Sequence, residues 1–181
     1  MSRERVIVAE PIHEEGIDLL RKKCQVVSLP AGSDERALLS QADKTDAVVS
    51  RGYIRITRDF MRAAHGLRVV AVHGAGVDHV DLEAASELGV VVFNTPDALT
   101  NAVAELTLAL ILALLRRIVT ADKAVRAGEW SRKFSDLVGL ELIGKTVGIV
   151  GLGRIGEAVA RRVRCFHANV IYSDVLERRQ L

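Results

Sequence analysis

The sequence predicts an α/β protein with a parallel sheet, and two observations support this fold class. In the first half of the chain, short β-branched runs alternate with stretches of helical periodicity, which is the pattern of successive βαβ units. In the second half, a strand-like run leads through a GxGxxG glycine turn into another helical stretch. The chain therefore combines a parallel-sheet domain with the beginning of a nucleotide-binding βαβ unit.

The first half contains a regular series of expected elements. Strand candidates lie at residues 6–9, 26–29, 47–50, 68–72 and 90–93. Helical stretches separate them, at residues 13–22, 34–41, 57–64 and 82–88. Crossovers between parallel strands are right-handed, so these helices should cover both faces of one sheet. We expect this domain to occupy residues 1–97 and to end at the sequence NTPD, residues 94–97.

A different pattern follows the proline at position 96. Residues 102–119 form one long helix candidate that is apolar almost all round, with no clear polar stripe. Such a helix should be buried on most sides, either between two domains or at a subunit interface. It is expected to end around Gly128, and residues 130–144 are expected to form a loop that leads into the glycine-turn strand.

The glycine turn GLGRIG, residues 151–156, has the flanking elements of a dinucleotide site. The run before it, residues 146–150, is apolar and β-branched, which is typical of a strand buried on both faces of a sheet. A helical stretch follows at about 157–166, and a second apolar run at 169–172 leads to Asp174. A purely structural turn is the alternative, and this combination of elements makes it the weaker hypothesis.

Each glycine of the turn has its own physical role. Gly151 permits the tight turn off the strand, Gly153 lets the main chain approach a pyrophosphate, and Gly156 allows close packing of helix on strand. The free N–H groups and the positive dipole end of the helix form an anion site. Asp174 follows where an acceptor for the adenosine ribose hydroxyls is expected.

A second candidate site follows the expected strand 68–72. The segment HGAGVDH, residues 73–79, places small residues at the carboxyl end of a parallel strand, where backbone N–H groups can bind an anionic ligand. Arg51 follows strand 47–50 and would lie at the same edge, where it could pair with a carboxylate or a phosphate. A plain glycine-rich turn and an exposed surface arginine are the alternatives, and the residues alone leave them open.

Composition limits the classes of function. Of the 181 residues 49% are hydrophobic and 27% charged, and the formal net charge is +2, so no strong field favours nucleic acid or an anionic membrane. The amino-terminal apolar run is too short for a signal peptide, and residues 106–115 are too few to cross a bilayer. The two cysteines form no disulfide framework, and no His/Cys/Asp cluster has metal-ligand spacing. We expect a cytoplasmic protein with no metal site.

Several motifs together resemble the D-2-hydroxyacid dehydrogenases, a family that includes phosphoglycerate dehydrogenase and glyoxylate/hydroxypyruvate reductase. They occur in order and at the usual spacings: VVSR at 48–51, GAGVDHVDLEAA at 74–85, NTPD at 94–97, AVAEL at 102–106 and GKTVGIVGLGRIG at 144–156. The resemblance implies a flavodoxin-like parallel-sheet substrate domain in residues 1–97. Residues 98–181 would then hold an inter-domain helix and the first, incomplete half of a Rossmann domain that binds NAD.

The resemblance also implies roles for single residues. Ala75 and Gly76 match the loop whose backbone binds the substrate carboxylate, and Ala75 would also lie near the nicotinamide. Arg51 matches an arginine that phosphoglycerate dehydrogenases use near the substrate's phosphate end, whereas NTPDALT at 94–100 looks more like the glyoxylate/hydroxypyruvate branch. The substrate therefore stays open between the two branches. The implied cofactor-binding residues are Ala75, Gly151, Gly153, Arg154, Ile155, Gly156 and Asp174.

The cofactor and the oligomeric state also follow from the resemblance. NAD is expected rather than NADP, because the charge of Asp174 repels a 2′-phosphate, although Arg178 and Arg179 could offset that repulsion. A homodimer is expected through the helix of residues 102–127.

The implied reaction is the NAD-dependent interconversion of a small D-2-hydroxy acid and a 2-keto acid such as glyoxylate, hydroxypyruvate or phosphohydroxypyruvate. The family's catalytic arginine, glutamate and histidine follow the second Rossmann strand, so we expect them beyond Leu181 and assign no catalytic residue here. The chain alone is therefore expected to be inactive. The alternatives are a non-catalytic NAD-binding or regulatory protein of the same fold and a free-standing flavodoxin-like module, which leaves the glycine turn unexplained.

Overall fold

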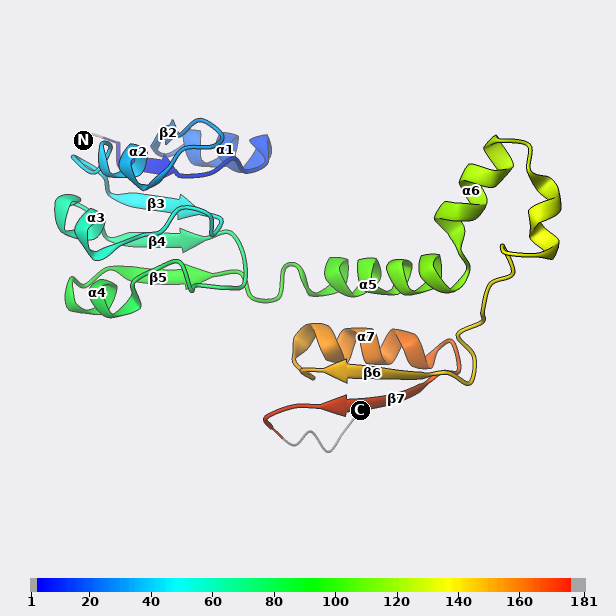
Figure 1. Cartoon of the computed structure of the whole chain (residues 1–181). Coiled ribbons are helices and arrows are strands. Elements are labelled where there is room, and N and C mark those ends of the chain that lie inside the picture. Colours follow the sequence, from blue (N-terminus) through cyan, green and yellow to red (C-terminus); the bar gives the residue numbers. More distant parts are fainter. Residues whose placement is uncertain (1–2, 177–181) are drawn as a thin grey trace. The chain divides into compact units, whose positions relative to one another are not determined.

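The computed structural model of the chain describes residues 3–176. The chain divides into two compact units, with the boundary between Ala98 and Leu99 (Figure 1). The first unit contains a parallel sheet of five strands, and the second contains a two-stranded parallel sheet with several helices. The α/β fold class and the parallel sheet predicted from the sequence are thus confirmed.

The strands of the first unit have the order β2-β1-β3-β4-β5, and all neighbours are parallel. Their bounds are β1 (Arg5–Val8), β2 (Gln25–Ser28), β3 (Ala47–Ser50), β4 (Val69–Val72) and β5 (Val91–Asn94). The connecting helices are α1 (Glu14–Arg21), α2 (Glu35–Leu39), α3 (Arg58–Ala63) and α4 (Leu82–Glu87). Every expected strand forms within two residues of its expected bounds.

A side-chain cap begins each helix of the first unit. His13, Asp34, Thr57 and Asp81 precede the four helices, and each side chain accepts a hydrogen bond from a backbone N–H of the first turn. Such a bond satisfies a donor that has no partner within the helix. These caps explain why the helices begin where the periodic pattern of the sequence begins.

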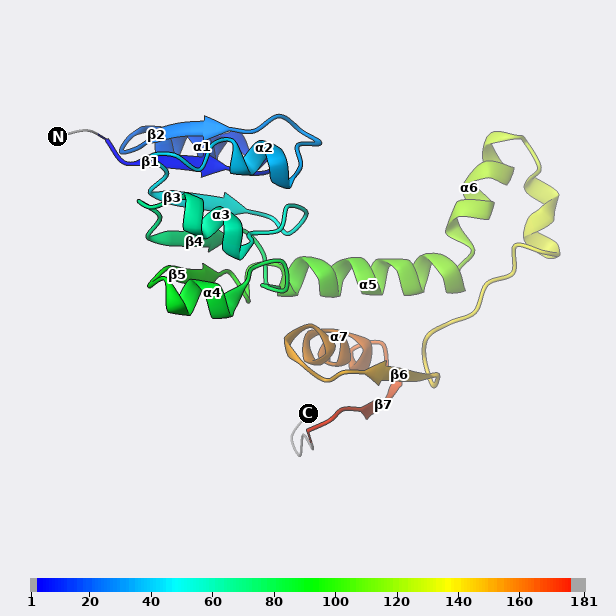
Figure 2. The same cartoon turned by 60° about the vertical axis from the view of Figure 1, so that its left-hand side comes forward.

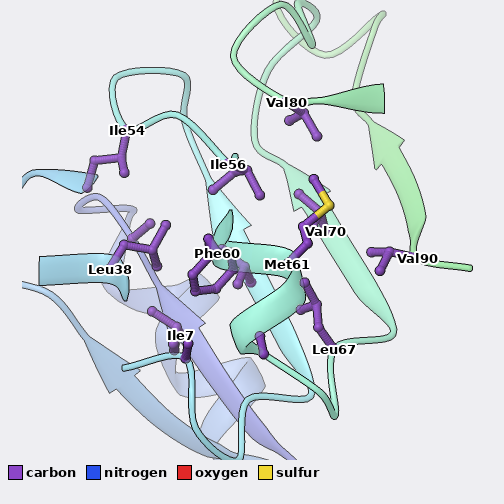
Figure 3. Packing of buried hydrophobic residues seen from close by; sticks show 14 of the residues in the cluster. Ile7, Leu38, Ile54, Ile56, Phe60, Met61, Leu67, Val70, Val80 and Val90 are labelled. Carbon is purple, nitrogen blue, oxygen red and sulfur yellow. The ribbon is translucent and has the colours of Figure 1, made fainter. Parts of the chain in front are cut away.

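The core of the first unit lies between the sheet and the helices α2, α3 and α4 (Figure 3). Figure 3 shows Ile7 of β1 and Val70 of β4 facing Phe60 of α3, and all three side chains are almost completely buried. The opposite face carries α1, which packs against β2 and buries Ile17. Helices therefore cover both faces, as right-handed crossovers require.

The second unit is built around a βαβ unit. The elements β6 (Thr146–Val150), α7 (Arg154–Arg164) and β7 (Asn169–Ser173) form it, and β6 pairs with β7 in parallel. The helix α5 (Thr100–Leu115) lies alongside α7 in both views (Figures 1 and 2). Between them lies a small apolar core of Ala104, Leu142, Ala158, Val159, Val163 and Ala168.

The long apolar helix expected over residues 102–119 does not form as one piece. It breaks into α5 and α6 (Ile118–Arg126), because Arg117 adopts a left-handed conformation with φ 52°. The carbonyl of Leu115 accepts a hydrogen bond of 2.8 Å from the backbone N–H of Leu140, and this distant loop replaces the next helical turn. The expected loop at 130–144 also contains a short 3-10 helix, η1 (Trp130–Phe134).

Within the second unit, the apolar helix α5 is buried on one side, and its expected burial between two domains or at a subunit interface stays a prediction. Only one face of α5 packs against α7, and on the other face Leu110 is 61% exposed and Leu114 80% exposed.

Within residues 3–176, no helix is both long and apolar enough to cross a membrane.

Strand β6 likewise differs from its expected burial on both faces. Val147 and Ile149 pack against the apolar core beside α7, whereas Val150 is 94% exposed. The cause is that, among the described residues, helices cover only one face of this two-stranded sheet. Alternation of exposed and half-buried residues follows from the two-residue period of a strand.

Candidate functional site

The first candidate site lies at the carboxyl edge of the five-stranded sheet. Because the strands are parallel, the residues that follow β1, β3 and β4 and the last residue of β5 all lie at this edge. They are Glu10, Arg51, the segment 73–76 and Asn94. Arg51, Ala75 and Gly76, which the sequence singled out, therefore belong to one edge of one sheet.

Glu10 holds the loop that carries Arg51. Its side chain is buried, with 6% of the residue exposed, and one carboxylate oxygen accepts the backbone N–H of Arg51 at 2.8 Å. The other oxygen accepts the backbone N–H groups of Tyr53 at 2.9 Å and Ile54 at 2.8 Å. The guanidinium of Arg51 donates to the carbonyl oxygen of Pro11 at 2.7 Å. Both ends of Arg51 are thus fixed by the segment that follows β1.

The loop after β4 presents backbone donors. The carbonyl of Gly74 accepts the N–H of Thr95 at 2.9 Å, and the side-chain amide of Asn94 donates to the carbonyl of Ala75 at 2.6 Å. The backbone N–H groups of Ala75 and Gly76 find no acceptor within residues 3–176, and both residues are exposed. Adjacent N–H groups with no protein acceptor are suited to bind an anion such as a carboxylate.

A hydrogen bond connects the two loops of this edge. The hydroxyl Oγ of Ser50, which is fully buried, lies 3.0 Å from Nε2 of His79. Gly52, two residues after Ser50, adopts φ 110°, and a Cβ built on it would lie 3.7 Å from Nδ1 of His79. Sequence reasoning missed the roles of Glu10 and His79. An acidic residue placed directly after an all-apolar strand was the available signal for Glu10.

The second candidate site is the glycine turn between β6 and α7. Gly151 has φ 86°, a conformation that favours glycine. The first bond of the helix runs from the N–H of Glu157 to the carbonyl of Gly153 at 2.8 Å, so the N–H groups of Ile155 and Gly156 lie at the open helix end. No side chain caps this end, which leaves it suited to an anion.

Two glycines of the turn differ in what surrounds them. A Cβ on Gly156 would collide with the carbonyl oxygen of Gly151 and lie 3.2 Å from Cγ2 of Ile149. A Cβ on Gly153 would meet no atom within 4 Å. Gly156 therefore serves the packing of the helix on the strand, whereas Gly153 leaves open space at the helix terminus. This is the space that a pyrophosphate would need.

Asp174 lies beside the glycine turn. Its carboxylate accepts the backbone N–H of Leu152 at 2.5 Å through one oxygen and that of Leu176 at 3.0 Å through the other. The open turn, the uncapped helix end and the nearby carboxylate fit the phosphates and ribose of a dinucleotide. Arg178 and Arg179, which bear on the choice between NAD and NADP, lie outside the described residues.

The clearest change in pKa belongs to neither site. In the second unit, hydrogen bonds from Arg132 lower the pKa of the Asp136 carboxyl from its ordinary value of 3.8 to about 2. In the first unit, an ion pair with Arg58 lowers the pKa of Glu87. None of these four residues is among those described above for the two sites.

The family model described as "D-isomer specific 2-hydroxyacid dehydrogenase, catalytic domain" matches residues 6–174. The match covers nearly the whole chain. The chain belongs to this family of oxidoreductases.

Relatives of this chain include both branches that the sequence left open. It is 41% identical to the D-3-phosphoglycerate dehydrogenase of Methanocaldococcus jannaschii over 94% of this chain and 32% of that protein. It is also 41% identical to the glyoxylate reductase of Thermofilum pendens, over 99% of this chain and 54% of that protein. The chain thus spans about a third to a half of the length of these relatives.

A solved structure with a bound cofactor is also similar. It is the NADPH-dependent glyoxylate/hydroxypyruvate reductase of Sinorhizobium meliloti, in complex with NADP and malonate, with a TM-score of 0.83 and 32% identity. The similarity covers 99% of this chain and 56% of that one. The cofactor of that similar protein is therefore NADP.

Proposed function

We propose that the protein carrying this chain is an NAD-dependent oxidoreductase that interconverts a small D-2-hydroxy acid and its 2-keto acid. The observation that carries the proposal is the pair of exposed amides at Ala75 and Gly76, which lie at the carboxyl edge of a parallel sheet. These amides bind the substrate carboxylate. The glycine turn of the second unit adds the dinucleotide that such a reaction requires.

The substrate is a 2-keto acid such as glyoxylate, hydroxypyruvate or phosphohydroxypyruvate. Its carboxylate lies on the amides of Ala75 and Gly76, and the guanidinium of Arg51 binds an anionic group at the far end when the substrate has one. Arg51 uses one of its donors for the carbonyl of Pro11, so other guanidinium N–H groups remain for this contact.

The cofactor lies at the amino-terminal end of α7. Backbone N–H groups at Gly153, Ile155 and Gly156 bind its pyrophosphate, with Arg154 beside them, and Gly151 shapes the turn. Asp174 accepts hydrogen bonds from the adenosine ribose, and its charge favours NAD over NADP. When bound, the nicotinamide supplies the hydride for C2 of the substrate.

The protein acts as a homodimer through residues 102–127. The exposed faces of α5 and α6 support this proposal, because contiguous apolar surface on a protein marks an interaction site. The exposed apolar side chains are Val103, Leu106, Leu110, Leu114, Ile118, Val119 and Val125. The matching experiment compares oligomeric state after Leu114→Glu with that after Leu19→Glu, an exposed leucine on α1. Only the first change should shift a dimer to monomer.

The decisive experiment measures oxidation of NADH by the whole protein with glyoxylate, hydroxypyruvate and phosphohydroxypyruvate. Turnover of at least one keto acid supports the proposed function. Binding of NADH without turnover of any of them supports the alternative, a non-catalytic NAD-binding protein of the same fold. The 181-residue chain alone should bind NADH but show no turnover, because the catalytic arginine, glutamate and histidine of the family are expected beyond Leu181.

A further inference from the structure

Arg51 is exposed, yet hydrogen bonds hold both its backbone and its side chain. Its backbone N–H donates to the buried carboxylate of Glu10, and its guanidinium donates to the carbonyl of Pro11, the next residue along. A long charged side chain normally samples many rotamers at a surface, which costs binding free energy when a ligand fixes it. Contacts at both ends limit this freedom before any ligand arrives.

The inner side of the same loop is anchored in the core. Ile54 and Ile56 are almost completely buried and belong to the core cluster of the first unit, as Figure 3 shows. Ile56 is also bridged to Val80 in parallel. Between these anchors and β3, the course of the chain depends on the three N–H groups that Glu10 accepts.

His79 fixes the same loop to the segment that carries the substrate amides. Its Nε2 bonds the hydroxyl of Ser50, the residue before Arg51, and its backbone carbonyl accepts the N–H of Ile56 at 2.8 Å. The N–H of His73 donates to the carbonyl of Ser50 at 2.7 Å. Ser50 and the loop 51–56 are therefore joined to the segment 73–79 by these three hydrogen bonds.

We propose that Glu10 and His79 are positioning residues that set the distance between Arg51 and the amides of Ala75 and Gly76. This distance decides how long a dianionic substrate can be, so Glu10 and His79 act on substrate selection and touch no reacting atom. The inference rests on the proposed function, because it concerns the binding of the same keto acids.

Glu10→Asp tests the role of Glu10 most cleanly. It keeps the charge and removes one methylene, so the shortened carboxylate cannot hold all three N–H groups while the local electrostatic field is conserved. In the whole protein, we expect KM for phosphohydroxypyruvate to rise about tenfold, because small misplacements of a binding group are costly. KM for glyoxylate, which has no far anionic group, should change less than about twofold. Glu14→Asp, at an exposed ion pair with Arg21, is the matched control and should change neither.

The selectivity decides between positioning and general stability. Equal losses for both keto acids, or no change for either, would overturn the proposal for Glu10. If the unaltered protein turns over none of the three keto acids, the proposed function fails on its own. Hydrogen exchange in the chain then tests the inference directly, because Glu10→Asp should speed exchange of the Arg51, Tyr53 and Ile54 amides about tenfold or more. Unchanged exchange at these amides would overturn it.

The positioning role of His79 is tested by changing both His79 and its hydrogen-bond partner Ser50. His79→Phe keeps an aromatic ring but removes the bond to Ser50, and Ser50→Ala removes the same bond from the other side. The double variant should raise KM for phosphohydroxypyruvate no more than the larger of the two single changes, because both break one hydrogen bond. Fully additive effects of the two changes, or no effect of either, would overturn the proposal for His79.

Discussion

The two anion-binding loops of this chain are built in different ways. At the sheet edge of the first unit, side chains that are distant in sequence hold the loops: Glu10 and Asn94 bind backbone groups, and His79 binds Ser50. At the turn of the second unit, glycines within six residues shape the site, and the side chain of Asp174 binds the backbone N–H of Leu152. A site formed by local backbone conformation can be predicted from the sequence. A site formed by side chains from distant parts of the chain can be recognised only in the tertiary structure.

The largest effect should come from closing the space at the glycine turn. Gly156→Ala puts a Cβ against the carbonyl of Gly151 and close to Ile149, and both belong to the strand and turn on which α7 packs. We expect a loss of about 3 kcal/mol in the free energy of unfolding of the second unit, since backbone atoms cannot move aside cheaply. Denaturant unfolding of the second unit measures it.

Gly153→Ala is the matched control for this change. Its Cβ meets no atom within 4 Å, so stability should change by less than about 1 kcal/mol. Binding of NADH should nevertheless weaken about tenfold, because the methyl group occupies the space proposed for the pyrophosphate. Equal destabilisation by both alanines would remove the distinction between a packing glycine and a binding glycine.

A smaller effect is expected from Gly52→Ala at the sheet edge. With φ 110°, this position strains any residue that has a side chain, so we expect about 2 kcal/mol of destabilisation. Gly74→Ala is the control, because Gly74 has an ordinary φ and open space around it. Thermal unfolding of the two variants should separate them, and equal stabilities would show that the loop relaxes around an alanine.

Asn94→Ala should have a still smaller effect on stability, of about 1 kcal/mol, because it removes one hydrogen bond to the carbonyl of Ala75. Asn101→Ala is the control for this variant, because it removes a hydrogen bond from Arg162 in the second unit. Oxalate, an anion that resembles a keto acid, should bind less tightly to the first variant alone. Calorimetric titration of both variants gives the result, and equal affinities would contradict a role of Asn94 in holding the loop.

The smallest effect on stability is expected from the ion pair of Arg132 and Asp136. Neither residue belongs to the two sites, so the pair serves as a control for them. Because the pKa of Asp136 is lowered to about 2, its contribution to stability is fully present above its ordinary value of 3.8. That contribution is lost as the pH falls toward 2. An NMR titration should place the carboxyl midpoint near 2, and Arg132→Gln should return it toward 3.8. A midpoint near 3.8 in the unaltered chain would show that the pair does not form in solution.

The strands and the glycine turn could be predicted because their causes are local. Each strand of the first unit is a short run rich in β-branched residues, and its apolar side chains are contiguous in sequence. The role of Gly156 follows from the turn motif itself. Arg51, Ala75 and Gly76 were placed at one edge because the carboxyl ends of parallel strands share an edge.

The features that could not be predicted depend on contacts between distant residues. The break after α5 lies where the N–H of Leu140, from a distant loop, bonds the carbonyl of Leu115, and the sequence around Arg117 contains no local signal for it. The carboxylate of Glu10 binds amides more than forty positions away, so its purpose is visible only after folding. The exposure of Val150 follows from which helices cover β6, which an apolar run cannot reveal.

The most direct test of the account is a titration of the chain with NADH while its backbone amide resonances are followed by NMR. The account predicts saturable binding, with the largest shifts at Leu152, Gly153 and Ile155 at the turn between β6 and α7. It also predicts that Gly153→Ala weakens binding without unfolding the chain. Absence of binding, or binding that leaves these amides unmoved, would contradict the claim that the glycine turn holds the dinucleotide.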